Sequence, residues 1–412
     1  MDLDGLFLVP RQQEGNESDG VISLVRQWAD REIIGKRLDY FQNYPDLFTE
    51  KLRVLALSMG LQRLAVSEDA GGFGWNTPAH ASDTLNVVTE IGRADASTAI
   101  LMGMNYAVFS SVIARESSEK TRLCNDLIRR CLSDDLLLSS CILPGPGFKD
   151  ETTPLFKGRS LRAGLKREDG VFTLSGSGLR PLAGGALAHL FCVVCADADG
   201  APVIALVPAE AGGVALSNPL TTTGLNACTN ADITFDRVKI PPDNVIDYPG
   251  ATEDLHAWLN LLLGGASLGA GLNYFEILSD WCDSRVIKGS GLLKDNPLCA
   301  SVLADVAEEL ACTRLLLLDL AGIMSDSAVP GSGKQPGMFT YAGMIGARAQ
   351  QSVMRAINRG LELMGSAGYA KEWHAEKHWR DVKTIQSILC GVAAEAPTKM
   401  DTARYFYTCT AI

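Results

Sequence analysis

The chain has 412 residues, of which 47% are apolar and 21% are charged, and this combination excludes a disordered or collagen-like protein. Its length predicts two or three domains with large buried cores. The 48 acidic residues outnumber the 37 basic ones, and no stripe of Lys and Arg interleaved with aromatic residues is present, so nucleic acid is not expected as a partner.

The first third of the chain has the spacing of helices. Apolar residues recur three and four positions apart over four stretches, with Gly- and Asn-rich breaks between them, namely Val21–Ile33, Thr49–Met59, Ala79–Ile91 and Ala99–Ala114. We therefore predict an N-terminal α-helical domain over residues 1–135.

The middle of the chain has the character of β-structure. Short runs of β-branched and apolar residues alternate with Gly, Pro and Asp, as in GVFTLSG, LFCVVCAD, APVIALVP and DITFDRVKI. This pattern predicts a compact, barrel-like domain of antiparallel strands over residues 136–248.

Long helical periodicity returns in the last third. Gly- and Pro-rich segments such as KGSGLLKDNP and VPGSGKQPG punctuate it, which predicts a bundle of four or five helices over residues 249–412. The longest apolar stretch, Leu259 to Leu272, is short and Gly-rich for a bilayer, so we expect a buried core helix and no membrane span. The whole chain is thus predicted to be of the α+β class.

The cysteines and the N-terminus bear on location. The eleven cysteines are scattered and form neither a CxxC pair nor a zinc-binding group with histidine, so we expect reduced thiols. The first 15 residues lack the basic segment and long apolar run of a secretory signal. A cytoplasmic location is therefore expected.

Five segments in order carry a resemblance. They are MGLQRLAVSEDAGGFGWN (Met59–Asn76), EIGRADASTAI (Glu90–Ile100), GVFTLSGSGLRPLAGGALAHLFCVVCAD (Gly170–Asp197), GLNACTNADITFDRVKIPPDNVI (Gly224–Ile246) and RGLELMGSAGYAKEWHAEKHWRDVK (Arg359–Lys383). Taken together and in this order, they resemble the acyl-CoA dehydrogenase superfamily.

The resemblance implies a function as well as a fold. An acyl-CoA thioester would be clamped over the flavin of FAD, losing an α-proton to a carboxylate and a β-hydride to the flavin. Electrons would pass to an electron-transfer flavoprotein or another acceptor. The cofactor would lie between the middle domain and the bundle and reach a neighbouring subunit, which implies a homodimer, a homotetramer or a hetero-oligomer with an active homologue.

Four positions correspond to the family's contacts with the flavin ring. At the start of the middle domain the family's Thr-Glu is replaced by Ile142-Leu143, and on the next strand its aromatic residue and Thr are replaced by Arg180 and Leu182. The resemblance therefore implies a flavin site in which two side-chain hydrogen bonds, each worth roughly 0.5–1.5 kcal/mol, are lost.

Other positions correspond to the contacts with the pyrophosphate. Arg285, assisted by Lys288, follows the first bundle helix where the family has a phosphate-binding arginine. Glu362 stands where the family has a Gln, ahead of the Gly365 turn. A carboxylate there would repel a diphosphate unless it turns toward an arginine of its own helix, Arg355 or Arg359.

The catalytic base of the family is missing at both of its known positions. The usual position reads Cys390 and the alternate position reads Leu259. Glu395 is the first candidate for a relocated base, and the pair Glu253-Asp254 is the second; both are also compatible with solvated helix ends.

Three further features have a structural and a chemical interpretation. Cys390 is either a nucleophile or a buried inert thiol. His374 and His378 have the spacing of two metal ligands on a helix, but no third ligand accompanies them, so no metal is predicted. Arg380 and Asp381 are predicted to form a buried ion pair with each other.

The sequence thus leaves three functions open. The first is α,β-dehydrogenation of an acyl thioester with FAD as hydride acceptor. The second is a catalytically degenerate subunit that pairs with an active homologue, and the third is a flavin-dependent oxidase or monooxygenase on the same fold.

Overall fold

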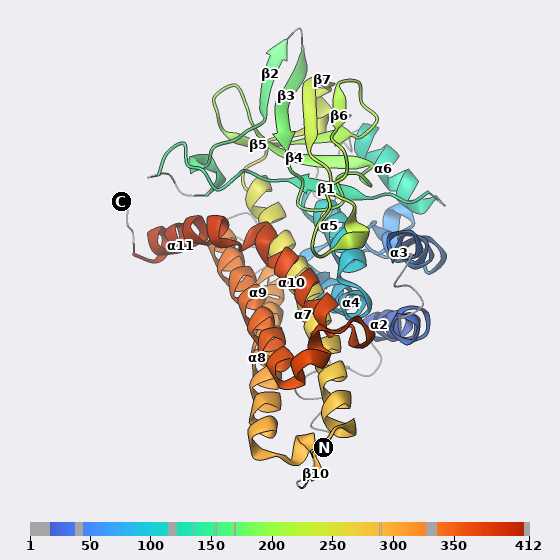
Figure 1. Cartoon of the computed structure of the whole chain (residues 1–412). Coiled ribbons are helices and arrows are strands. Elements are labelled where there is room, and N and C mark those ends of the chain that lie inside the picture. Colours follow the sequence, from blue (N-terminus) through green and yellow to red (C-terminus); the bar gives the residue numbers. More distant parts are fainter. Residues whose placement is uncertain are drawn as a thin grey trace.

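The computed structural model describes most of the chain. The described residues are 17–37, 44–113, 122–133, 135–151, 153, 155–168, 170–287, 289, 291–326 and 336–407. Figure 1 shows the sheet at one end of the molecule and the long helices extending from it, with the N-terminal helices packed along one side.

The N-terminal part is helical, as predicted. Its helices are α2 (Glu17–Trp28), α3 (Tyr44–Arg53), α4 (Ala81–Ala94), α5 (Ala96–Val108) and α6 (Arg122–Leu132). Asp95 separates α4 from α5, and its carboxylate accepts a hydrogen bond of 2.8 Å from the amide of Thr98. This N-cap lets α5 start in a new direction directly after α4 ends.

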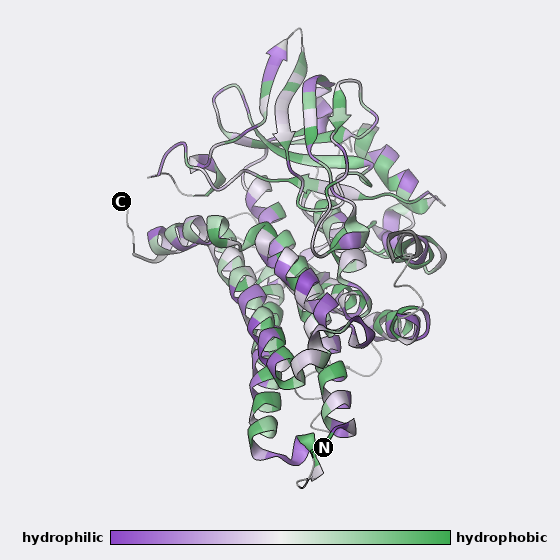
Figure 2. Ribbon diagram, in the orientation of Figure 1, coloured by the Kyte–Doolittle hydropathy of each residue, from purple (hydrophilic) through white to green (hydrophobic). Residues whose placement is uncertain are grey.

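The middle part is a single sheet. Its strands are β1 (Ser139–Ile142), β2 (Gly164–Glu168), β3 (Val171–Leu179), β4 (Leu190–Ala196), β5 (Pro202–Pro208), β6 (Val214–Leu216), β7 (Ile233–Ile240) and β8 (Val245–Ile246). The order is β6-β7-β3-β2-β4-β5-β8, with β1 pairing on β4. Figure 2 shows β4 and β5 as largely hydrophobic ribbons, which agrees with their almost complete burial.

The antiparallel prediction is correct for most strand pairs and wrong for two. β1 runs parallel to β4 from Ser139↔Leu190 to Ile142↔Val193, and β2 meets β4 in parallel at Gly164↔Ala196. The hairpin of β2 and β3 lies between β1 and β4 in sequence. After this hairpin the chain enters β4 in the same direction as it ran in β1. The sheet is therefore mixed.

The C-terminal part is a bundle, as predicted. Its helices are α7 (Ala251–Ser284), α8 (Pro297–Ser325), α9 (Pro336–Met364), α10 (Ala375–Leu389) and α11 (Val392–Tyr407). Between α7 and α8 the Gly-rich segment forms a small pair of strands, β9 (Val286–Ile287) and β10 (Gly291–Leu292), at the far tip of the molecule (Figure 1).

Two helices have the length and hydropathy of membrane spans but are core elements of this fold. The apolar window within 96–113 is entirely buried and the one within α7 is 83% buried by the rest of the chain. This agrees with the prediction of a core helix around Leu259, whose side chain is inaccessible to solvent. The ten described cysteines are all free thiols.

Glycines let α7 pack closely against α4. A Cβ on Gly269 would overlap the carbonyl oxygen of Thr89, whereas a Cβ on Gly322 in α8 would meet no atom within 4 Å. We expect Gly269→Ala to lower the free energy of unfolding by about 1–3 kcal/mol through overpacking. Gly322→Ala, the matched control, should raise it by roughly 0.5–1 kcal/mol. Urea denaturation measures both, and equal effects of the two substitutions would contradict the close approach of α4 and α7.

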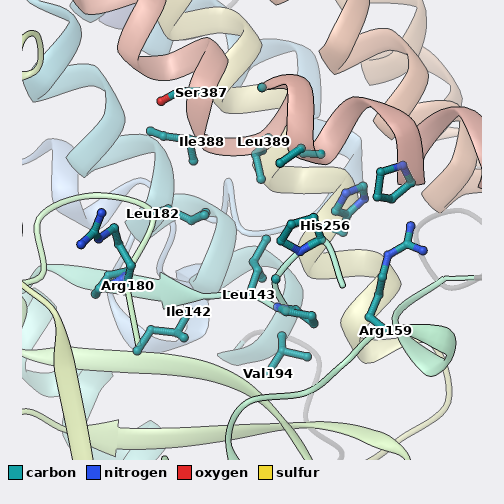
Figure 3. Close-up of a pocket in the computed structure, with 18 of the residues that line it drawn as sticks. Ile142, Leu143, Arg159, Arg180, Leu182, Val194, His256, Ser387, Ile388 and Leu389 are labelled. Carbon is teal, nitrogen blue, oxygen red and sulfur yellow. The ribbon is translucent and has the colours of Figure 1, made fainter. Parts of the chain in front are cut away.

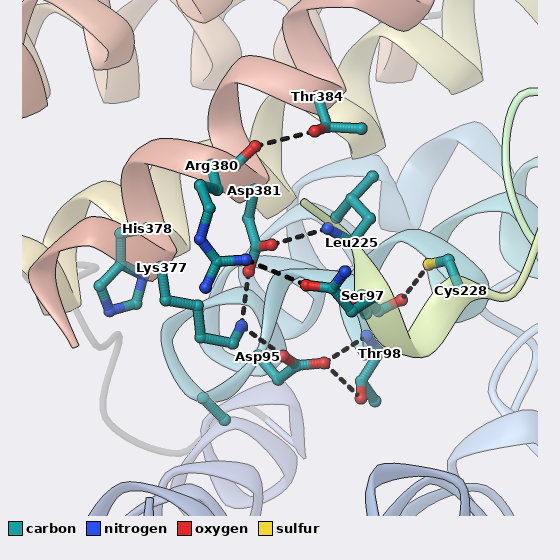
Figure 4. A network of polar contacts seen from close by, with 12 residues as sticks. Asp95, Ser97, Thr98, Leu225, Cys228, Lys377, His378, Arg380, Asp381 and Thr384 are labelled. Carbon is teal, nitrogen blue, oxygen red and sulfur yellow. Dashed lines mark hydrogen bonds and ion pairs between the residues drawn. The ribbon is translucent and has the colours of Figure 1, made fainter. Parts of the chain in front are cut away.

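A buried ionic network ties the N-terminal helices and the sheet domain to α10 (Figure 4). The ammonium of Lys377 bonds the carboxylates of Asp95, at 2.8 Å, and Asp381. Asp381 also accepts a 2.7 Å bond from the amide of Leu225. Burial lowers the pKa of Lys377, but the two carboxylates more than offset this, so its pKa lies above the usual value.

The prediction that Arg380 and Asp381 pair with each other is wrong. Neighbours in a helix point about 100° apart, so the two side chains face different elements. Asp381 turns inward to Lys377, while Arg380 bonds Glu376 one turn earlier and the carbonyl oxygen of Thr223 at 2.8 Å. Each still fixes α10 to the rest of the molecule, through a different partner.

Candidate active site

A cavity of about 520 Å³ lies between the sheet and the bundle. Its walls come from the end of β1 and the segment after it, the end of β3, the start of α7, α9, and the junction of α10 with α11. Figure 3 shows Arg180 and Arg159 on opposite sides of the view, with alkyl side chains and His256 between them. The cavity therefore has an apolar middle and arginines toward its ends.

All four positions predicted to contact a flavin ring line this cavity: Ile142, Leu143, Arg180 and Leu182. They come from two strands, β1 and β3, and from the residues that directly follow them. The structure therefore gathers segments some 40 residues apart in sequence into one wall, opposite Ile388 and Leu389 of α10 (Figure 3).

The arginine at the first end is already paired. The Arg180 guanidinium holds Asp232 in a bidentate contact of 2.7 and 2.9 Å and is itself largely exposed. The hydrogen bond from Arg180 lowers the pKa of the Asp232 carboxyl group. This arginine therefore fastens β3 to the start of β7 as well as bordering the cavity.

The walls fit the flat, apolar part of a flavin. Ile142, Leu143 and Leu182 supply alkyl surface to the faces of a ring, and the cavity volume lies within the range of ligand sites. Thr384 and Ser387 donate their hydroxyl protons to carbonyl oxygens of their own helix, at 2.8 and 2.7 Å. Their oxygens remain able to accept a hydrogen bond from a ring N–H. These residues would hold the ring by shape and apolar contact more than by donated hydrogen bonds.

The predicted pyrophosphate residues do not line this cavity. Arg285 is exposed at the C-terminal end of α7, over the ring of Trp281 at 5.3 Å. Glu362 pairs with Arg359 at 3.3 Å, which confirms the predicted turn toward its own helix. Gly365 follows α9 with φ +60°, a conformation that favours glycine. Lys288 lies outside the described residues.

None of the predicted base positions reaches the cavity in the described structure. Leu259 is fully buried in the interior of α7. Glu395 pairs with Lys399 at 2.5 Å, on the side of α11 that does not line the cavity. Cys390 caps α10 between two lining residues, and burial raises the pKa of its thiol to about 12. The thiol is therefore protonated at neutral pH, which favours the inert interpretation.

Among the described residues that line the cavity, Asp401 is the single carboxylate. Its Oδ2 accepts a 2.5 Å bond from Arg159, and its Oδ1 accepts a 3.1 Å bond from the amide of Leu155. Burial raises the pKa of Asp401, and Arg159 opposes that rise. A carboxylate held in this way is an ion-pair partner, and it is poorly suited to removing a proton from carbon.

The sequence did not point to the aromatic wall of the cavity. His256 stacks on Phe339 with ring centroids 3.9 Å apart, and Phe156 packs edge-on against both rings. The three residues come from α7, α9 and the segment after β1, so no local pattern joins them. A single histidine in an otherwise apolar helix was the one signal available.

Three histidines predict a loss of stability in acid: His378 is buried, and His256 and His374 are partly buried. Burial lowers the pKa of His256 to about 3 and that of His374 to about 4, and it holds the pKa of His378 well below its usual value. Below about pH 6.5 the unfolded chain therefore takes up protons that the folded chain does not. The free energy of unfolding should fall by up to about 1.4 kcal/mol per pH unit for each histidine as the pH drops from about 6.5 toward 4, and by less for His374, which is the most exposed to solvent screening.

Urea unfolding at about pH 7.5 and about pH 5 measures this dependence. His256→Phe keeps a ring against Phe339 and removes one titrating group, so its pH slope should be smaller by about one proton. A variant slope equal to that of the wild type would show that His256 is not a buried neutral group.

Comparison with known proteins agrees with this fold. Sequence models of the acyl-CoA dehydrogenase N-terminal and C-terminal domains match residues 16–123 and 258–392, more than half of the chain. The chain belongs to the acyl-CoA dehydrogenase superfamily, whose members are FAD flavoproteins. This confirms the predicted family and agrees with the predicted cofactor.

The relatives are distant but nearly full-length. The chain is 24% identical over 374 residues to cyclohex-1-ene-1-carbonyl-CoA dehydrogenase of Geobacter metallireducens, covering 89% of this chain and 92% of that one. It is 23% identical over 379 residues to the human mitochondrial short-chain specific acyl-CoA dehydrogenase, covering 89% and 85%. The structure of butyryl-CoA dehydrogenase from Megasphaera elsdenii superposes with a TM-score of 0.78 at 18% identity, covering 97% of this chain and all of that one.

Proposed function

We propose that this chain oxidises an acyl thioester at its Cα–Cβ bond in the cavity between sheet and bundle, slowly because no described residue that lines the cavity is a free carboxylate. The observation that carries the proposal is the single cavity lined by all four predicted flavin positions, Ile142, Leu143, Arg180 and Leu182. FAD would supply the acceptor of the β-hydride. The full-length similarity to dehydrogenases of acyl-CoA esters supports the same reaction.

The residues of this chain would contribute binding and the exclusion of water. Alkyl side chains on both walls, including Leu143, Leu182 and Leu389, desolvate the space in which the thioester would lie. With Asp401 held by Arg159, no described residue that lines the cavity is a free base for the α-proton, so proton removal would be the slow step. Electrons would pass on to an electron-transfer flavoprotein or another acceptor.

We further propose that the site is completed by a second subunit in a dimer or tetramer. Arg285, Glu362 and Gly365 lie on the bundle away from the cavity of their own chain, which supports a role toward a neighbour's cofactor. The ion pair of Glu362 with Arg359, which also contacts Asp305, reduces the repulsion of a diphosphate only slightly.

The pairing of the Asp401 carboxylate with Arg159 also favours a second function. In this function the chain is a degenerate subunit that supports an active homologue. No described residue lining the cavity is a carboxylate free of an ion pair, and loss of the base removes a contribution of roughly 10²- to 10⁴-fold to the rate. In this case the chain would bind cofactor and ligand, and turnover would belong to the paired subunit.

One experiment separates the two functions. The chain is purified alone and after co-expression with a homologue that retains the glutamate, and its FAD content and its rate with butyryl-CoA are measured. Slow oxidation with one FAD per chain in the protein alone supports the first function. Absence of turnover alone, with recovery of a stable mixed oligomer, supports the second, and a colourless protein in both preparations contradicts flavin binding altogether.

A further inference from the structure

Two arginines share one buried aspartate at the end of the cavity opposite Arg180. Arg159 lies in the segment that connects β1 to β2, directly after its short helix at Phe156–Gly158, and donates to Asp401 at 2.5 Å. Arg404, one turn further along α11, has its Nη1 3.7 Å from the same carboxylate. Since one negative charge faces two positive ones, the cluster carries a net charge of +1.

Both guanidinium groups keep unused donors. Arg159 and Arg404 are only 6% and 7% exposed. Nη1 of Arg159 and both Nη atoms of Arg404 have no hydrogen-bond acceptor among the described residues. Phe148 lies over both groups, at 4.4 and 5.7 Å, but its ring covers a face of the guanidinium and leaves the N–H edges unsatisfied. Buried donors without acceptors destabilise the protein unless a ligand satisfies them.

Part of this cluster lines the cavity. Arg159 and Asp401 are lining residues, together with the aromatic wall of Phe156, His256 and Phe339, whereas Arg404 does not line the cavity and reaches the cluster through Asp401. His256 is neutral, because burial and then the charge of Arg159 hold its pKa at about 3. The third lining arginine, Arg162, donates to the carbonyl oxygen of Gly178 at 3.1 Å, toward the Arg180 end of the cavity, and Asp401 is the single carboxylate among the described lining residues. The surroundings thus add no negative charge, and their low polarity strengthens the attraction for an anion.

We infer that Arg159, with the added positive charge of Arg404 behind it, forms an oxyanion-binding subsite at this end of the cavity, which takes a carboxylate or phosphate group of the ligand. Both groups accept paired hydrogen bonds from guanidinium. The inference rests on the proposed function for the identity of the ligand as an acyl thioester, and it adds that this ligand carries an anionic group at a fixed place. The anion is either a carboxylate at the far end of the acyl group or a phosphate of the CoA moiety.

The first test compares thioesters by calorimetry with the flavin-containing protein. Glutaryl-CoA and butyryl-CoA differ by a terminal carboxylate, and butyryl-CoA and butyryl-pantetheine differ by the phosphates. We expect the anion-bearing member of one pair to bind about 10- to 100-fold more tightly. Tighter binding of glutaryl-CoA than of butyryl-CoA shows that the subsite takes the acyl carboxylate. Tighter binding of butyryl-CoA than of butyryl-pantetheine shows that it takes a phosphate.

The tighter binding of the anion-bearing thioester should depend on Arg159 and Arg404. Arg159→Met is expected to remove it, and Arg404→Met, which leaves the contact of Arg159 with Asp401 intact, should weaken it about tenfold. Arg167→Met is the matched control, because Arg167 of β2 lies over the ring of Phe172 of β3, outside the cavity. The inference is overturned if Arg159→Met and Arg404→Met leave the affinity ratios of both thioester pairs unchanged. It is also overturned if the wild type binds the two members of each pair equally tightly.

Stability gives an independent readout. An arginine kept for anion binding is an excess buried charge, so Arg404→Met should leave the midpoint of urea unfolding unchanged or raise it while it weakens ligand binding. A purely structural arginine would lower that midpoint and leave the ligand preferences as they are, which would contradict the inference. Since none of these measurements uses flavin reduction, failure of the proposed oxidation would leave them interpretable.

Discussion

Cys390→Glu is expected to accelerate the bleaching of bound flavin by butyryl-CoA under nitrogen about 10²- to 10⁴-fold, the usual contribution of a general base. Cys390 stands where the resemblance places the family's carboxylate, and it lies between Leu389 and Gly391, which both line the cavity. Burial would raise the pKa of a glutamate there toward neutrality, which suits proton removal near pH 7.

A second variant and a control make this result interpretable. Leu389→Glu places the carboxylate on a side chain that already faces the cavity (Figure 3), and it should also accelerate bleaching. Cys390→Gln has the shape of the glutamate without its basicity and should remain as slow as the wild type. If neither glutamate variant exceeds the wild-type rate while flavin and thioester still bind, the missing carboxylate does not limit this reaction.

Lys377→Met is expected to lower the free energy of unfolding by about 3–5 kcal/mol, the usual effect of removing one partner from a buried ion pair. Lys377 is buried between Asp95 and Asp381, and its loss would remove the ammonium that both buried carboxylates contact (Figure 4). Asp95 also caps α5, so the damage should spread to the N-terminal helices.

Urea denaturation at neutral pH measures this effect. The matched control is Lys383→Met on the same helix, where the exposed ammonium donates to Gln386; a change within about 0.5 kcal/mol is expected. Adding Asp381→Asn to Lys377→Met should restore part of the loss, because one uncompensated charge is removed. A single-variant effect as small as that of the control would show that the network is not a major source of stability.

Local patterns were sufficient to predict most of the architecture. The three- and four-residue spacing in Ala79–Ile91 and Ala99–Ala114 corresponds to α4 and α5, because each of these helices has a buried apolar face. The resemblance in Gly170–Asp197 placed Arg180 and Leu182 on the cavity wall. Strand direction was predicted less well. The parallel pairing of β1 with β4 depends on the path of the chain between them, which the local residue pattern of either strand does not indicate.

The polar partners were not predictable from the sequence. Arg159 and Asp401 are 242 positions apart and Lys377 and Asp95 are 282 apart, so only the folded chain brings them together. Arg380 and Asp381 were predicted to pair because they are adjacent in sequence. On a helix, adjacent side chains point in different directions, and these two bind different partners. Glu395, chosen as the nearest carboxylate in sequence, faces Lys399 because side chains one turn apart on a helix meet more readily than those across a cavity.

Under the proposed function, one cavity holds flavin and thioester together without a free base. A rapid-mixing visible spectrum of the purified chain with butyryl-CoA under nitrogen tests this directly. We expect an immediate, saturable shift of the flavin band as the thioester binds, followed by bleaching at least roughly a hundredfold slower than in Leu389→Glu. Bleaching of the wild type within the mixing phase would mean that a base is present, and an unshifted flavin band at saturating thioester would place the ligand elsewhere.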